Sequence, residues 1–258
     1  MFYVCLALAA LFGSAAQAAA PVYSAESIVN GANFAPGPLA ANAIATIFGT
    51  DLAWSTETLT EENTRAGALP NSLADVRVFV GNYSAPLIYV SPAQINFLIP
   101  GNLSQGPQPV WVARQGVHGP EVTITLVDAV PQFFRNKDGY VVAQHADYSL
   151  ITPDHPARPG EVIVVYATGL GMTHPNPLPG EIPIYPGLMD RLVALQVTVG
   201  TVVLPPDRIL YAGVTPGWAG LYQINMRLPD PLGSDPELKA AVGDQKGAPG
   251  LKLATGSP

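Results

Sequence analysis

The sequence predicts an all-β fold built as two tandem immunoglobulin-like β-sandwiches. Short apolar segments are separated by turn-forming residues, which include 25 Gly and 27 Pro in a chain of 258 residues. The hydrophobic share of 48% is high enough to supply a folded core. Three segments of the first half also recur in the same order in the second half, which indicates that one sandwich has been duplicated.

The recurrence is clearest in a Gln-Ile-Asn motif. The segment "VSPAQINFLIP" starts at Val90, and "GLYQINMRLP" starts at Gly220. In the same order, "ATIFGTDLA" is answered by "VVYATGLG", and "VRVFVG" by "LQVTVG". The two copies are separated by about 118 residues at "ATIFGTDLA", about 119 at "VRVFVG" and about 129 at Gln-Ile-Asn. The second copy therefore carries about ten extra residues within the stretch 201–220. We therefore predict a first sandwich over residues 21–130 and a second over 131–258.

Each copy contains a series of predicted strands with alternating or continuous apolar residues. In the first copy they cover residues 43–48, 75–80, 87–90, 94–99, 110–114 and 122–127, and in the second copy residues 140–145, 162–167, 195–199, 209–211 and 221–228. The segment "VIVVYA" is apolar on both faces and predicts a central strand, whereas "VRVFVG" alternates and predicts one solvated face. Residues 235–243 fit either a short helix or the penultimate strand.

Residues 1–20 have the features of a signal peptide. An apolar run is followed by small residues that include Ala16-Gln17-Ala18, the pattern of a signal-peptidase site. An N-terminal membrane anchor is the alternative, but the apolar run is too short to span a bilayer, and no later segment is long and apolar enough to do so. Cys5 is the single cysteine and lies in this leader, so we expect an exported mature chain without disulfides.

The charge balance argues against nucleic-acid binding. The chain has 12 Lys+Arg against 19 Asp+Glu, which gives a formal net charge of -7 at pH 7. A nucleic-acid interface requires a basic patch, which this composition does not supply. A nucleic-acid partner is therefore not expected, and no membrane span is expected after the leader is cleaved.

Several longer motifs resemble a known family. The segments "NFAPGPLAANAIATIFGTDLA", "APLIYVSPAQINFLIP", "PARPGEVIVVYATGLG" and "YAGVTPGWAGLYQINMRLP" resemble uncharacterised secreted acidobacterial proteins of the Solibacter type, in which the module usually stands at the C-terminus. More distantly, Gly-Thr-Asp-Leu after an alternating strand resembles the start of an IPT/TIG domain. The resemblance implies export and a tandem β-sandwich, and it implies no catalytic residues.

Motifs for catalysis and metal binding are absent from the sequence. It contains no Gly-x-Ser-x-Gly elbow, no His-Glu-x-x-His and no phosphate-binding glycine loop. His145 and His155 are expected in surface loops, with a contact between the two in space as the alternative. Asn-Lys-Asp-Gly at 136–139 could offer oxygens to calcium, but a tight turn explains it better. The two carboxylates of a glycoside hydrolase are paired in space and not by their spacing in sequence. A small secreted hydrolase is therefore the least favoured alternative. Its candidate acids at strand ends and in loops are Asp51, Asp75, Glu161 and Glu181.

The candidate binding residues lie in and around the two copies of the repeated motif. They are Trp218, Tyr222, Gln223, Asn225, Gln94 and Asn96. Trp218 is the strongest candidate because it lies in the extra residues of the second copy, although a Trp that merely covers the end of the sandwich is the simpler interpretation. Alternation places the Ile of each motif in the core. The Gln and Asn amides are expected to bond to backbone groups of the adjoining loop, and a polar strip that binds a ligand is the alternative.

We therefore expect a non-catalytic, secreted or cell-surface interaction module for protein binding or surface adhesion. The first alternative is a carbohydrate-binding module. The expected partner is an extracellular protein or a polysaccharide, and the expected location is extracellular or on the cell surface, with the periplasm as the alternative. No catalytic residue, metal or cofactor is expected, and the sequence leaves the oligomeric state open.

Overall fold

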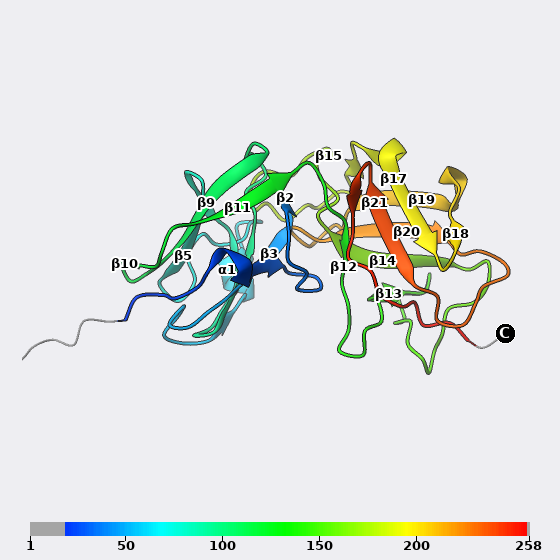
Figure 1. Ribbon diagram of the computed structural model, residues 1–258, viewed down its shortest axis with the longest axis horizontal. Helices are drawn as coiled ribbons and strands as arrows, with labels where there is room; N and C mark the ends of the chain where they lie inside the picture. The colour runs from blue at the N-terminus through cyan, green and yellow to red at the C-terminus, as the bar shows by residue number, and fades with distance from the viewer. Residues whose placement is uncertain (1–18, 257–258) are drawn as a thin grey trace, which may run out of the picture.

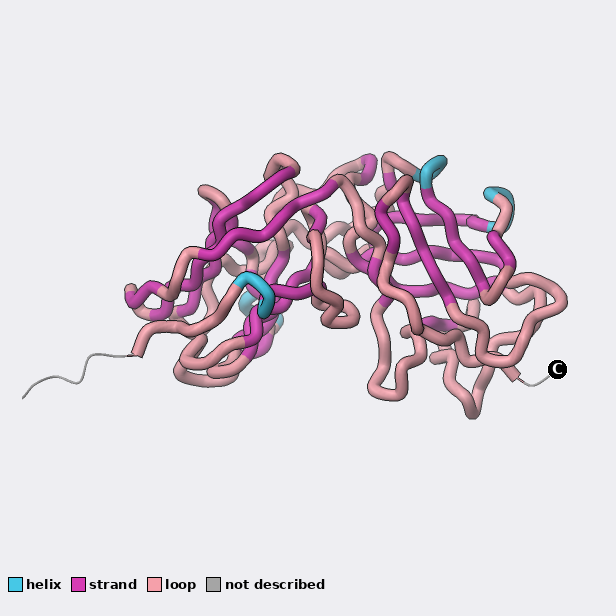
Figure 2. Tube along the Cα trace, viewed as in Figure 1, coloured by secondary structure: helices cyan, strands magenta, loops and turns pink. Residues whose placement is uncertain are grey.

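The protein consists of two all-β lobes, each with two packed sheets, as predicted. The computed structural model describes residues 19–256, so the expected leader at 1–20 lies almost entirely outside the described residues. In Figure 1 the N-terminal lobe lies beside the C-terminal lobe, with β12 (Gln132–Phe133) between them. Figure 2 shows that strands and loops make up most of both lobes and that helices are confined to single short turns.

The first sandwich is formed by β1 to β11. One sheet has the order β1 (Ile28–Asn30), β3 (Ile44–Phe48), β8 (Gln94–Leu98), β7 (Leu87–Val90), β4 (Glu57–Thr58). The other has the order β2 (Leu39–Ala40), β11 (Val122–Val127), β9 (Gly106–Arg114), β5 (Val76–Val80), β6 (Tyr83–Ala85), and β10 (Val117–His118) pairs with β9. A four-residue helix, α1 (Glu61–Thr64), follows β4.

The second sandwich is formed by β12 to β22. Its larger sheet has the order β12, β14 (Val162–Thr168), β20 (Tyr222–Arg227), β19 (Ile209–Val214), β16 (Leu188–Met189), β15 (Thr173–His174), and β13 (Ala143–Gln144) pairs with β14. The smaller sheet has the order β18 (Val202–Val203), β17 (Leu195–Val199), β21 (Leu238–Val242), β22 (Gln245–Lys246). The described residues also form three 3-10 turns, which are η1 (Ala25–Ser27), η2 (Leu192–Ala194) and η3 (Pro206–Arg208).

The two sandwiches share the same strand pairings, which is the structural form of the sequence repeat. β3 pairs antiparallel with β8 in the first, and β14 pairs antiparallel with β20 in the second. β5 pairs with β9 as β17 pairs with β21. The repeated Gln-Ile-Asn therefore occupies one and the same strand of each sandwich, β8 and β20, with Ile95 and Ile224 fully buried.

Alternation of apolar residues explains which strand faces form the cores. In β5, Val76, Val78 and Val80 are fully buried while Arg77 is exposed, so this strand has one solvated face as predicted. β14 lies inside its sheet, between β12 and β20, which confirms the prediction of a central strand.

Three local expectations are settled by the structure. Residues 238–242 form β21, so the strand interpretation of 235–243 is correct and the helix is wrong. The strand expected at 140–145 shrinks to β13. Asn136 to Gly139 form the expected turn, in which the Asn136 Oδ1 accepts hydrogen bonds from the backbone N–H groups of Asp138 and Tyr140, at 3.0 and 2.9 Å.

Direct hydrogen bonds join the two sandwiches. The buried hydroxyl of Thr168 accepts a bond from the Ile44 N–H at 2.9 Å and donates one to the Gly220 carbonyl at 2.8 Å. Nearby, the Leu69 N–H donates to Gly180 O and the Ile182 N–H to Gly67 O, both at 2.8 Å. These bonds fix loops of the second sandwich against the first and set the walls of the groove described next.

Candidate functional site

The main candidate site is an apolar groove of about 570 Å³ at the junction of the two sandwiches. It is lined by Ile44, Leu59, Thr60, Glu61, Thr64, Leu69, Ile88, Phe134, Ile182, Gly217, Trp218, Ala219 and Leu221. This volume is within the range of pockets that hold a small molecule. We call this cavity the junction groove.

The floor of the junction groove comes from the outer face of the first sandwich. Ala45 and Ile47 of β3 point into the core, so Ile44 must point outward. On β7, Ile88 is likewise only partly buried, between the buried Leu87 and Val90. Outward positions of an exposed sheet are usually polar, and these apolar side chains are the signal by which the sequence could have revealed the groove.

Trp218 forms one side of the junction groove and is 66% exposed. It lies in the turn between β19 and β20, which is part of the extra residues of the second copy. The turn is held by the Gly217 N–H, which donates to Pro183 O at 2.6 Å, and by the Thr215 N–H, which donates to Leu221 O at 2.9 Å. The backbone around the indole is therefore fixed while its ring remains accessible.

The loop between β15 and β16 extends this apolar surface. Its residues Ile184 and Tyr185 are 74% and 71% exposed, and both line a hollow of about 90 Å³ that also includes Glu181 and Pro183. Because Pro183 is bonded to Gly217, the hollow and the junction groove are neighbours. Of the described residues that line either one, only Glu61 and Glu181 carry a charge, so the rim is acidic.

The amides of the repeated motif bond to each other. In β8, the Gln94 Nε2 donates to the Asn96 Oδ1 at 2.8 Å, and the Thr46 hydroxyl is 2.9 Å from the same oxygen. In β20, the Gln223 Nε2 donates to the Asn225 Oδ1 at 3.0 Å.

The expectation that these amides tie down the adjoining loop is therefore wrong. In the first copy the loop is held instead by the Ser91 hydroxyl, which accepts a bond from the Gln94 N–H at 2.9 Å. All four amides are half-buried, and none lines the junction groove.

Tyr222 lies in the core of the second sandwich with no exposed surface. Its hydroxyl donates to Gly171 O at 2.6 Å, and burial raises the pKa of this phenol above its ordinary value of 10.0. Its side chain therefore stabilises the sandwich and is not accessible to a ligand. Of the six candidate binding residues, the structure places only Trp218 in an accessible cavity.

His145 is buried, so its expected position in a surface loop is wrong. Its Nδ1 is 2.6 Å from the Glu161 Oε1, its Nε2 is 3.2 Å from His155 O, and the two imidazole rings lie 4.2 Å apart. Burial acts to lower the pKa of His145, but the bonds to Glu161 and His155 O, with nearby carboxylates, outweigh it and raise the pKa above 6.5.

The four candidate carboxylates make separate contacts. Asp51 lies 3.9 Å from the Arg114 guanidinium and Asp75 accepts a bond from Gln115, while Glu161 contacts His145 and Glu181 accepts the Leu178 N–H. Among residues 19–256 there is no group of three His, Cys, Asp or Glu side chains arranged to hold a metal ion. No helix in this part of the chain is long and apolar enough to cross a membrane.

Comparison with known proteins gives one family match. Residues 28–126 match the IPT/TIG domain, which confirms that distant resemblance for the first sandwich. A search of the curated proteins finds no match.

Among solved structures the chain is similar to two SGBP-B proteins and an S-layer protein. SGBP-B of the Bacteroides ovatus mixed-linkage glucan utilization locus, in complex with a mixed-linkage heptasaccharide, is 10% identical with a TM-score of 0.31, over 80% of this chain and 36% of that one. SGBP-B of a Bacteroides uniformis xyloglucan utilization locus is 9% identical with a TM-score of 0.28, over 91% and 50%. Domains 5-6 of the S-layer protein SbsC are 10% identical with a TM-score of 0.27, over 91% and 99%. The chain spans between about a third and a half of the SGBP-B chains.

Proposed function

We propose that the protein is an exported, non-catalytic interaction module, and that its junction groove binds an apolar segment of a partner protein. The observation that carries this proposal is the exposed indole of Trp218 beside a groove lined mainly by partly exposed apolar side chains. A contiguous exposed apolar surface is unfavourable in water unless a partner covers it.

The residue types in the junction groove suit a protein partner. Tryptophan is among the commonest residues at the energetic centre of protein interfaces, because it buries a large area with few rotatable bonds. The adjoining Ile184 and Tyr185 enlarge the surface beyond the groove itself. Glu61 and Glu181 then lie at the rim, where charges mainly steer association and select the partner. A partner segment with apolar anchors and flanking basic residues complements both features.

Carbohydrate binding in the junction groove is the weaker proposal. Sugars require several hydrogen-bonding side chains around an aromatic ring. The groove offers Thr60, Glu61 and Thr64 on one side only, and its remaining side chains are apolar. A hydrolase is weaker still, because each of the four candidate carboxylates already contacts a different group.

Selection from a random peptide library displayed on phage tests the protein-binding proposal directly. The full chain is the immobilised target, and Tyr148→Ala is the matched control because Tyr148 is 78% exposed and does not line the groove. Enriched peptides are expected to combine aromatic or Leu anchors with Lys or Arg. The affinity of these peptides should be at least about tenfold lower for Trp218→Ala, because truncation of a central aromatic residue typically costs that much, and unchanged for the control. Failure to enrich peptides, or equal binding to both variants, would refute the proposal.

A further inference from the structure

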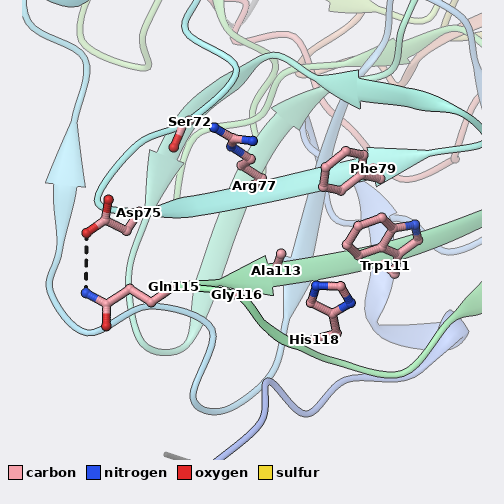
Figure 3. A pocket seen from close by; sticks show the side chains of 9 residues that line it. All are labelled: Ser72, Asp75, Arg77, Phe79, Trp111, Ala113, Gln115, Gly116 and His118. Atoms are coloured by element: carbon pink, nitrogen blue, oxygen red, sulfur yellow. Dashed lines mark hydrogen bonds between the residues drawn. The ribbon is translucent and has the colours of Figure 1, made fainter.

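A second hollow of about 440 Å³ lies on the opposite face of the first sandwich. The junction groove uses the outer face of the sheet that contains β3 and β7, whereas this hollow lies on the outer face of the sheet that contains β5 and β9. Its lining residues are Ser72, Asp75, Arg77, Phe79, Trp111, Ala113, Gln115, Gly116 and His118 (Figure 3). We call it the sheet-face hollow.

Three neighbouring rings form the apolar side of the sheet-face hollow, two of them stacked and the third tilted. Phe79 and Trp111 are directly opposite each other on β5 and β9, with ring centroids 3.9 Å apart and planes 8° from parallel. The His118 ring follows at 4.8 Å from Trp111. Cross-strand aromatic pairs of this kind hold one another in fixed positions on a sheet, so this side of the hollow is rigid.

Polar side chains form the other side. Ala113 follows Trp111 on the same face of β9, and its small side chain leaves the space that the hollow occupies. The Gln115 amide is held from two directions. Its Oε1 accepts a bond from the Trp54 Nε1 at 3.0 Å, and its Nε2 donates to the Asp75 Oδ2 at 3.3 Å, the bond drawn in Figure 3.

Arg77 lines the sheet-face hollow with a guanidinium that has no partner among the described residues. It is exposed and directly opposite Ala113 in the strand pairing. Among residues 19–256 its guanidinium makes neither an ion pair nor a hydrogen bond, whereas Arg114 and Arg191 are each paired with an aspartate. The hollow therefore offers free guanidinium donors close to a carboxylate acceptor, beside a rigid apolar wall.

We propose that the sheet-face hollow binds a sugar unit of a neutral polysaccharide. Each sugar hydroxyl is both donor and acceptor, so neighbouring hydroxyls can accept from Arg77 and donate to Asp75 at the same time. The facing sides of these rings pack against one another, so their partly exposed edges give the apolar C–H groups of the sugar a surface to contact. Neutral sugars are favoured over acidic ones because Asp75 lies beside Arg77 and the chain has a net charge of -7, which repels polyanions.

Native affinity electrophoresis of the full chain tests this inference. The gels contain a galactomannan, a xyloglucan, a mixed-linkage β-glucan or, as the polyanion, alginate. Retardation is expected in at least one gel that contains a neutral polysaccharide and not in the gel that contains alginate. Arg77→Met should weaken it by about tenfold or more, because a hydrogen bond to a charged group contributes that much.

Arg65→Met is the matched control, since it removes one exposed positive charge and changes the mobility equally without touching the hollow. Trp111→Phe keeps a stacked ring and should keep most of the affinity. Trp218→Ala should bind polysaccharide normally, so this inference and the proposed protein binding fail independently. Absence of retardation in all neutral gels, or equal retardation of Arg77→Met and Arg65→Met, would overturn the inference.

Discussion

Residues that are close in sequence have opposite roles around the second copy of the repeated motif. Trp218 lies in a turn and exposes most of its ring, whereas Tyr222, four residues later, is inside the core and donates its hydroxyl proton to Gly171 O. The first can contribute to binding and the second to stability. A substitution at each position therefore tests a different property of the molecule.

The two threonines that the repeat aligns have also diverged, and this leads to a stability prediction. Thr168 is fully buried and bridges the sandwiches, while Thr50 is exposed. Thr168→Val leaves the Ile44 N–H and the Gly220 carbonyl without their partner, so we expect unfolding in urea to show a loss of about 1–3 kcal/mol. Thr50→Val should stay within about 0.5 kcal/mol of the parent. Equal effects would contradict the role assigned to the Thr168 hydroxyl.

The His145 and Glu161 pair makes stability depend on pH. Because the folded-state pKa of His145 is raised, its stabilising contribution is fully present below the unfolded value of 6.5 and is lost as the pH rises through the folded value. We expect the Tm advantage of the parent over His145→Gln to shrink as the pH rises above 6.5. The control His174→Gln, at the exposed last residue of β15, should parallel the parent. A constant difference between parent and His145→Gln would exclude this linkage.

The turn between β19 and β20 is the element that connects the repeat to the junction groove. Gly220, near the end of this turn, has a φ of +74° and lies against Ile44 and Leu98 of the first sandwich. A Cβ at this position would clash with Leu98 and come within 2.8 Å of the Ile44 Cγ1. Only glycine satisfies both the backbone conformation and the close approach.

Alanine substitutions in this turn separate the two requirements. Gly217 also has a positive φ, of +87°, but a Cβ there would meet no atom within 4 Å. Gly217→Ala should therefore carry only the conformational penalty of about 1 kcal/mol, while Gly220→Ala adds the clash and destabilises the chain further. Chemical denaturation of both variants measures the difference, and equal midpoints would show that the junction tolerates a side chain at 220.

The elements that sequence patterns predict best are the long alternating strands. β5, β8, β11 and β17 lie within one residue of their expected bounds because five or six alternating residues specify a face. Strands of two or three residues, such as β2 and β12, have no periodicity and are defined only by the strands they pair with. The contact between His145 and Glu161 was missed for a related reason, since it joins two loops through tertiary structure.

At the scale of the whole molecule, the two proposed sites lie on opposite faces of the first sandwich. The junction groove combines side chains from both copies, so no single repeat contains it. Trp218 could be selected from sequence because it lies where the copies differ, but its neighbours Ile44 and Ile88 come from strands about 130 to 170 residues earlier. Only the packing of one sandwich against the other brings them together. This arrangement would let the module hold a protein partner and a polysaccharide at the same time.

Hydrogen–deuterium exchange of the full chain, with and without a library-selected peptide, tests whether the junction groove is the partner-binding site. Peptide binding should slow exchange in the segments that form the junction groove, which are residues 59–69, 180–185 and 215–221. Exchange in residues 111–118 of the opposite face should stay unchanged. Protection confined to residues outside those three segments would contradict the assignment of the groove as the partner-binding site.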